Sequence, residues 1–170
     1  GEYGWELSIP SDKSPQVFDA LVAAGAKPMG HYALDGCRIE KGFKHWGHDI
    51  GPNVTPLEAG LGFTIDWSKE FIGKAALETQ KTHGVTRRLC LFQVEGEPLL
   101  LHDEPIRCDG RVVGLTTSGA RGPRTGLDLC FGMVEASANG PFEIEVAGRT
   151  YPATRLKRPP FDPDGKRMRA

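Results

Sequence analysis

Residues 38–50 read Arg-Ile-Glu-Lys-Gly-Phe-Lys-His-Trp-Gly-His-Asp-Ile. Two aromatic residues, two histidines and an aspartate fall within seven of these positions, next to Gly42 and Gly47. Ordinary core packing does not need this combination, which is typical of a loop that lines a pocket or is held in one conformation. Glycine at such a place allows a positive φ or a close approach of the backbone. Because the surrounding block, residues 34–77, separates an α+β pattern from an all-β pattern, we interpret it as the joint between them and as a wall of a binding site.

The overall composition is that of a globular protein. The 170 residues are 39% apolar and 25% charged, and the formal net charge of −1 argues against a broad nucleic-acid surface. No run of about 18 apolar residues occurs, so no membrane-spanning helix is predicted. Widely spaced cysteines without a CxxC pair predict reduced thiols in an intracellular protein, cytoplasmic in a bacterium or in the mitochondrial matrix of a eukaryote. The cysteines are Cys37, Cys90, Cys108 and Cys130.

The chain opens without an initiator methionine and without a targeting segment. In residues 4–9 the apolar Trp5, Leu7 and Ile9 alternate with polar residues, a pattern that predicts a half-buried strand. A domain rarely begins inside a strand, so we expect these residues to be the C-terminal part of a longer protein.

The first half of the chain is predicted to contain helices and one further strand. Ser14 is a suitable N-cap, Pro15 suits the first turn of a helix, and Gly25 is a typical helix end. The predicted elements are helices over 14–25 and 29–39, a loop over 45–56, a strand over 60–67 and a helix over 68–84.

After Gly84 the period of apolar residues changes from helical to alternating. The pair Asp109-Gly110 is a strong hairpin signal because both residues tolerate a positive φ. The predicted strands are 88–94, 105–108, 111–117, 130–134, 142–146 and 150–156. The fold class is therefore α+β, with a partial α+β domain over 1–85 and a small antiparallel β-barrel or jelly roll over 86–170. The tail from Pro159 is expected to be extended and to pack back on the barrel.

Two groups of side chains are candidates for binding chemistry. Glu6 lies beside Trp5 in the predicted first strand, where its carboxylate would accept two parallel hydrogen bonds from a planar heterocycle; a solvent-facing glutamate is the alternative. His45, His48 and Asp49 have a partial metal-ligand spacing. They lie in a glycine-rich loop with no further His or Cys cluster, so no metal site is predicted, and the rings are expected to bond backbone carbonyls.

Two further features have structural interpretations. Glu40 and Glu58 are candidate buried partners of Arg38, with a surface ion pair as the alternative. Residues 114–126 are rich in glycine and carry two arginines, but they lack both GxxxxGK[ST] and GxGxxG. We interpret them as a barrel loop, with a loop that faces an anion as the alternative.

Four blocks, in order, resemble the aminomethyltransferase family, which contains the glycine-cleavage T-protein and its relatives. The first, Gly-Glu-Tyr-Gly-Trp-Glu-Leu at residues 1–7, is similar to the family's Gly-Glu-x-Gly-aromatic-Glu strand. The others are Arg-Ile-Glu-Lys-Gly at 38–42, Thr-Pro-Leu-Glu-Ala-Gly-Leu at 55–61 and Phe-Ile-Gly-Lys at 71–74, while 113–119 and 132–134 look like its C-terminal barrel. The resemblance covers nearly the whole chain.

This resemblance implies a tetrahydrofolate-binding protein of one-carbon metabolism, with folate in a central channel. It implies that Glu6 contacts the pterin ring and that Phe43 lines the folate, and we expect Trp5 and Arg38 to belong to the same cofactor site. The family's key aspartate lies in the N-terminal half. No residue of this chain is therefore expected to be catalytic, and the chain alone is expected to be inactive.

One departure from the T-proteins is informative. The position four residues before Arg38 holds a folate-binding arginine in T-proteins, and here it is Leu34. Arginine presents a charged fork that holds a carboxylate or a ring, and leucine removes it. Residues 38–50 look more like the sarcosine and dimethylglycine dehydrogenases, in which a T-protein-like folate module follows an FAD domain.

In that parent protein, FAD in the upstream domain would oxidise an N-methyl amine, and the folate module would capture the one-carbon unit as methylene-tetrahydrofolate. The expected partners are an amine-derived small molecule and the N-terminal half of the parent chain, with no nucleic acid and no membrane. Two alternatives stay open. One is a stand-alone aminomethyltransferase that works with a lipoyl carrier protein, and the other is a folate-binding protein without transfer activity.

Overall fold

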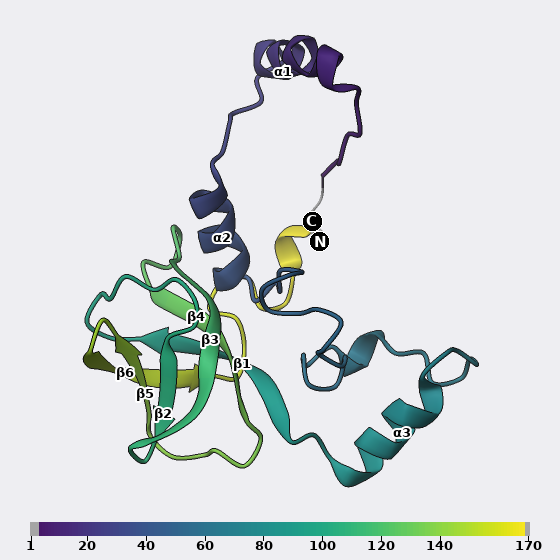
Figure 1. The fold of residues 1–170 in the computed structure, drawn as a ribbon. Coiled ribbons are helices and arrows are strands. Elements are labelled where there is room, and N and C mark those ends of the chain that lie inside the picture. The colour runs from purple at the N-terminus through teal and green to yellow at the C-terminus, as the bar shows by residue number, and fades with distance from the viewer. Residues whose placement is uncertain (1–3, 169–170) are drawn as a thin grey trace.

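The structure, a computed structural model, describes residues 4–168 and shows a helical N-terminal part followed by a β-barrel (Figure 1). The helices are α1 (Ser14–Ala23), α2 (His31–Glu40) and α3 (Lys74–His83). The strands are β1 (Arg87–Val94), β2 (Pro105–Cys108), β3 (Arg111–Arg121), β4 (Asp128–Glu135), β5 (Phe142–Val146) and β6 (Arg149–Leu156). Helix α2 lies against the barrel, whereas α1 and α3 project away from it.

The six strands form a closed antiparallel barrel in the order β1-β4-β3-β2-β5-β6. Strand β1 pairs with both β4 and β6, which closes the sheet and leaves no free strand edge. The hairpin between β2 and β3 turns at Asp109 and Gly110, whose φ angles are 50° and 76°. The predicted α+β class and antiparallel barrel are thus confirmed, and β3 and β4 are longer than predicted.

Alternation along the strands creates two apolar layers, because successive side chains of a strand point to opposite faces. The inner layer fills the barrel around the fully buried Phe92, Ile106 and Ile144. The outer layer places Ile39 of α2, which is also fully buried, against the outward-facing side chains of β1 and β4. Those side chains are Leu91, Leu129 and Phe131. Ile39 therefore fixes α2, and with it residues 38–50, on the barrel wall.

The predicted strand over residues 4–9 is wrong, because the described residues of this segment are exposed and irregular. Trp5 is 92% exposed. An isolated extended segment leaves its backbone N–H and C=O groups unpaired, and none of the strands in residues 4–168 pairs with this one. The apolar alternation is present in the sequence, but a strand also needs a neighbouring strand that pairs with its backbone groups.

The predicted strand over 60–67 is also wrong, since this segment is a series of turns around a 3-10 helix at Gly62–Thr64. Helix α3 begins at Lys74 and not at Ser68. The Ser68 amide and hydroxyl instead bond Asp66 Oδ1 at 3.1 and 2.6 Å, which forms a local turn. Gly73 then precedes the helix with a φ of 93°. The helices over 14–25 and 29–39 and the loop over 45–56 are confirmed within a few residues.

The C-terminal segment folds back on the end of α2 and not on the barrel alone. The Phe161 amide donates to the Glu40 carbonyl at 3.0 Å, and Lys41 pairs with Asp162. Lys41 and Arg124 also lie over the Phe161 ring, at 5.8 and 4.8 Å from its centroid. These contacts hold the tail across the joint.

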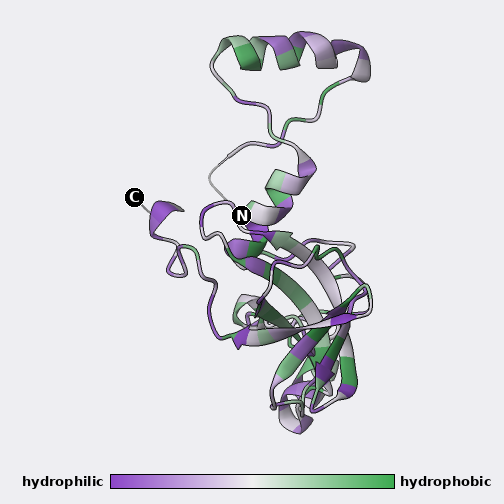
Figure 2. Ribbon diagram, turned by 90° about the vertical axis from the view of Figure 1, so that its left-hand side faces the viewer, coloured by the Kyte–Doolittle hydropathy of each residue, from purple (hydrophilic) through white to green (hydrophobic). Residues whose placement is uncertain are grey.

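Helix α1 contains apolar residues, seen as the green segments of the uppermost helix in Figure 2, and their side chains are exposed. Phe18, Leu21 and Val22 are 55%, 45% and 41% exposed, and α1 has no buried residue. In the described part of the chain, no helix has the length and apolar character needed to cross a bilayer.

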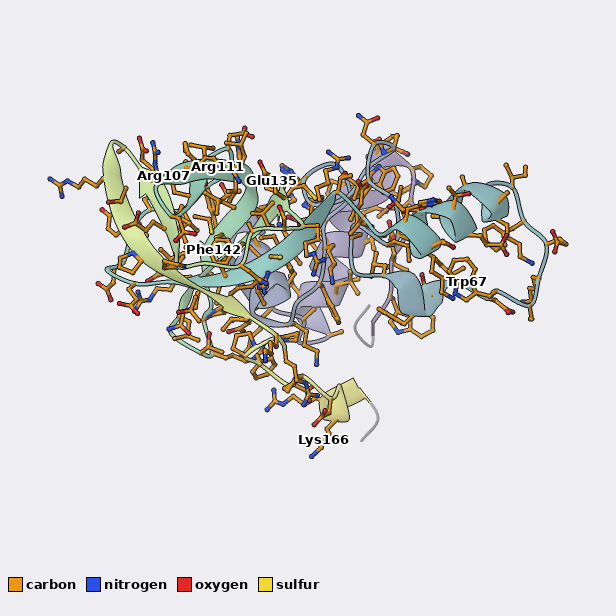
Figure 3. All side chains as sticks on the ribbon, turned by 90° about the horizontal axis from the view of Figure 1, so that it is seen from below. Trp67, Arg107, Arg111, Glu135, Phe142 and Lys166 are labelled. Atoms are coloured by element: carbon orange, nitrogen blue, oxygen red, sulfur yellow. The ribbon has the colours of Figure 1, made fainter. Side chains whose placement is uncertain are left out.

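The barrel surface also carries an exposed ion pair with good geometry. Arg111 on β3 donates from Nη1 and Nη2 to the two carboxylate oxygens of Glu135 on β4, each at 2.7 Å (Figure 3). The two side chains are 61% and 43% exposed, so solvent screens the pair and it adds little to stability. The pair between Arg38 and Asp49, in contrast, is buried.

Candidate functional site

Asp49 is the centre of the joint. Its Oδ2 accepts hydrogen bonds from Arg38 Nη1 at 2.5 Å and the His45 amide at 2.9 Å. Its Oδ1 accepts from the hydroxyls of Thr117 and Ser118, each at 2.6 Å. The residue is 1% exposed, so these bonds are made in a low-dielectric environment where leaving them unmade would be costly. One carboxylate therefore ties α2, the loop after it and β3 together.

Arg38 is held on two sides and keeps one guanidinium nitrogen free. Its Nε donates to Asp35 at 2.7 Å, and its Nη1 also lies 3.3 Å from the Phe43 carbonyl. Its Nη2, which carries two N–H donors, has no hydrogen-bond partner among residues 4–168. The side chain is only 11% exposed and lines a groove, so a fixed guanidinium with an unused nitrogen lies at the wall of that groove.

The groove runs between α2, the loop from β1 to β2, and β3. Its volume is about 770 Å³, which is within the usual range for small-molecule sites. Its walls combine apolar, aromatic and charged groups, including Tyr32, Asp35, Arg38, Leu99, His102 and Ser118. Tyr32 is 87% exposed at its rim. Such a lining suits a ligand that has both a flat ring and hydrogen-bonding groups.

Glu40 forms a second tether between α2 and the barrel. Its Oε2 accepts the amides of Arg124 and Thr125 at 3.1 Å each and the Thr125 hydroxyl at 3.2 Å. Its Oε1 is buried without a hydrogen bond, and Arg124 Nη1 lies 3.6 Å away. A Cβ on Gly122 would lie 2.7 Å from Oε2. The predicted loop over 114–126 is wrong in its first part, because residues 114–121 belong to β3. The remaining segment, 122–126, is a loop that faces an anion, and that anion is the protein's own Glu40.

The predicted pairing of Arg38 with Glu40 or Glu58 is wrong. Residues two apart on a helix point in different directions, so the Glu40 carboxylate does not face the Arg38 guanidinium. Glu58 is buried but pairs with Arg87 at 2.9 Å, and its other oxygen accepts the Thr55 amide at 2.9 Å. Burial acts to raise the pKa of Glu58, but the bonds and charge from Arg87 and Thr55 outweigh it, and the pKa is lowered.

The histidines gather beside the groove. The rings of His45 and His48 are 4.8 Å apart, and those of His48 and His102 are 6.4 Å apart. Within residues 4–168 no three His, Cys, Asp or Glu side chains are arranged to hold a metal ion. The expected bonds from the His45 and His48 rings to backbone carbonyls do not occur among the described residues. The His45 main chain makes the contacts instead, since its carbonyl accepts the Asp49 amide at 2.9 Å.

The four predicted cofactor residues fall into two groups. Arg38 lines the groove, whereas Phe43 does not and is linked to Arg38 only through its carbonyl, which accepts from Nη1. Trp5 and Glu6 lie in the exposed segment, and neither makes a hydrogen bond within the described residues. Thr117 and Ser118 were not predicted to belong to the site, because they lie far from Asp49 in the sequence. The one signal for them was a pair of hydroxyl residues within a strand of apolar alternation.

Comparison with known proteins places this geometry in a family. Residues 1–69 match the GCVT N-terminal domain, and residues 87–162 match the glycine cleavage T-protein C-terminal barrel domain. A crystal structure of glycine cleavage system aminomethyltransferase T from Bartonella henselae has the same fold, with a TM-score of 0.76 at 21% identity. The match covers 87% of this chain and 43% of that one.

Three curated relatives show the same similarity. The chain is 42% identical to 4-methylaminobutanoate oxidase (formaldehyde-forming) of Paenarthrobacter nicotinovorans, over 99% of this chain and 22% of the relative. It is 38% identical to an aminomethyltransferase of Nostoc sp., over 94% and 44%, and 37% identical to mitochondrial sarcosine dehydrogenase of Mus musculus, over 99% and 20%. The chain thus spans from a fifth to under half of the length of these relatives. With the two domain matches in order along it, the chain belongs to the aminomethyltransferase family of the glycine-cleavage T-protein, as the sequence blocks predicted.

Proposed function

We propose that this chain is the tetrahydrofolate-binding part of a one-carbon-metabolism enzyme. The observation that carries the proposal is the groove beside Arg38, where the Nη2 nitrogen stays free although Nε and Nη1 are held by Asp35, Asp49 and the Phe43 carbonyl. Residues that only fix the joint would have no need of such a donor. The family membership supports the same function.

Of the residues predicted to bind folate, Arg38 lines the groove, and the others do not. A volume of about 770 Å³ accommodates a pterin ring with its aromatic arm, and Tyr32 offers a ring at the rim. Arg38 would donate a hydrogen bond to a ring oxygen or a carboxylate. Glu6 and Trp5 do not line this groove, so they would join the site only if the exposed segment were held against it.

The chain's own contribution to the reaction would be positioning. Tetrahydrofolate, when bound, supplies a nucleophilic nitrogen that accepts a one-carbon unit. Asp49 would keep Arg38 rigid through its four hydrogen bonds, and a rigid donor orients a ligand at little entropic cost. The groove walls would shield the ligand from water on the barrel side. No side chain of residues 4–168 is assigned a proton transfer.

The parent enzyme is proposed to be an FAD-dependent demethylating dehydrogenase of the sarcosine or dimethylglycine type. Leu34 in place of the T-protein arginine supports this reading, as does the 42% identity to an oxidase over 99% of the chain. The second candidate is a stand-alone aminomethyltransferase, which the 38% identity to the Nostoc enzyme favours.

Calorimetric titration of tetrahydrofolate into the native-length protein, with an absorbance spectrum of the same sample, tests both the folate site and the proposed type of parent enzyme. Binding together with a flavin band supports the dehydrogenase, and binding to a colourless protein supports the aminomethyltransferase. A protein that does not bind tetrahydrofolate would overturn the proposal. The Tyr32→Ala variant, at the exposed rim of the groove, should bind more weakly with unchanged thermal unfolding, and Glu135→Gln, on the barrel surface, should bind as the unchanged protein does.

A further inference from the structure

A second cavity lies on the outer wall of the barrel, where the loop after α2 crosses β1, β4 and β6. Its volume is about 190 Å³, and it shares no lining residue with the groove beside Arg38. Its floor is apolar and consists of Leu89, Leu91, Phe131 and Leu156. A cavity of this size and lining suits a short aliphatic molecule.

Lys44 and Lys157 are the two amines that line this cavity, and Lys44 is the less exposed of them. It is half-buried, and its Nζ lies 5.7 Å from the centroid of the Phe131 ring. Within residues 4–168 it makes no hydrogen bond, and no carboxylate oxygen lies within 4.0 Å of Nζ. The neighbouring Lys41, in contrast, is paired with Asp162. Lys44 is thus a partly desolvated amine without a counterion.

The charges around the cavity do not compensate the Lys44 ammonium. Arg155, Lys157 and Arg158 also line it, and no acidic residue does. Asp49, on the same loop, is the carboxylate that acts on Lys44 from farther away, and it is engaged by Arg38 and by two hydroxyls. Burial lowers the pKa of Lys44, and the charge of Asp49 only partly opposes this. The neutral amine is therefore more populated than in an exposed lysine.

We propose that Lys44 is a carbonyl-reactive amine, and that the cavity around it takes small aliphatic aldehydes. The neutral Nζ attacks the aldehyde carbon, a C–N bond forms, and the carbonyl electron pair moves to oxygen, which takes one of the two Nζ protons. In the resulting carbinolamine the C–O bond breaks as the nitrogen lone pair forms the C=N bond of a Schiff base, and the hydroxyl leaves as water with the remaining Nζ proton. No electron donor or acceptor is required. Desolvated lysines without a partner are suited to this reaction.

Competitive labelling of the folded protein tests this assignment. Propanal at limiting concentration, with cyanoborohydride to reduce each Schiff base, would be reacted at pH 7.5, and labelled lysines would be quantified by peptide mass spectrometry. Lys27, which is exposed and forms no ion pair within the described residues, is the internal reference. Lys44 is expected to be labelled faster than Lys27, because burial lowers the pKa of Lys44 and so raises the fraction of neutral amine.

Two further measurements sharpen the result. The labelling rate of Lys44 should reach half of its maximum at a lower pH than that of Lys27, and unfolding in urea should abolish the difference. In Lys44→Arg the fast phase should disappear while Lys27 is labelled as before. Equal or slower labelling of Lys44 in the folded protein would overturn the proposal. The outcome is independent of tetrahydrofolate binding.

Discussion

The Ser118 hydroxyl donates a 2.6 Å hydrogen bond to the Asp49 carboxylate, across a separation of 69 residues in the sequence. This bond joins the loop after α2 to the third strand of the barrel. Through Arg38, the same carboxylate also fixes the wall of the groove. The stability of the joint and the geometry of the proposed ligand site therefore depend on one buried side chain.

Asp49→Asn should destabilise the fold substantially. The amide keeps the shape of the side chain but removes the buried carboxylate of Arg38 and leaves only the partly exposed Asp35 as its ionic partner. Breaking a buried pair typically costs about 3–5 kcal/mol. Urea unfolding of the variant measures the loss. Glu135→Gln is the matched control, because that pair is exposed and worth about 1 kcal/mol or less. Equal losses in the two variants would contradict the central role of Asp49.

Gly122→Ala should also be destabilising, because the loop must approach the Glu40 carboxylate closely. A Cβ there would lie 2.4 Å from Thr125 Oγ1 and 2.7 Å from Glu40 Oε2. Overpacking of this kind costs about 1–3 kcal/mol. Gly51→Ala is the control, since its Cβ would meet no atom within 4 Å. Thermal unfolding of both variants should separate them, and a melting temperature of Gly122→Ala equal to that of the control would count against the tether.

The part of the fold that local patterns encode was predictable, and the part that depends on distant partners was not. Asp109-Gly110 and the alternation around it identified the barrel hairpins without any tertiary information. Residues 4–9 show the same alternation but no strand, because no neighbour pairs with them in the described chain. Asp49 was recognisable as unusual, but its bonds to Thr117 and Ser118 arise only when the barrel closes on the loop.

Ionised Glu58 should contribute to the free energy of unfolding, and this contribution should depend on pH. Its pKa is lowered in the folded state, so the unfolded chain takes up the proton first as the pH falls. The stabilisation is fully present above about pH 4.5 and is lost as the pH falls through the folded-state pKa. Glu58→Gln should therefore flatten the decline of unfolding free energy with acid. Urea titrations from pH 3 to pH 7 measure this, and an unchanged slope would show that the Arg87 pair does not act as described.

The cysteines should differ sharply in reactivity. Burial raises the pKa of the Cys90 and Cys130 thiols, which disfavours the reactive thiolate. Cys108 is 6% exposed, whereas Cys37 on α2 is half-buried. Iodoacetamide at pH 8 should alkylate Cys37 first and the other three only after unfolding. Early labelling of Cys130 in the folded protein would contradict the closed barrel.

The groove beside Arg38 is proposed to hold tetrahydrofolate. Hydrogen–deuterium exchange of the native-length protein, with and without saturating tetrahydrofolate, tests this placement. We predict slower exchange in α2 and in the loop over residues 97–102, both of which line the groove, with no change in β5 and β6. Tetrahydrofolate that binds without slowing exchange in α2 or in that loop would show that the ligand does not lie in this groove.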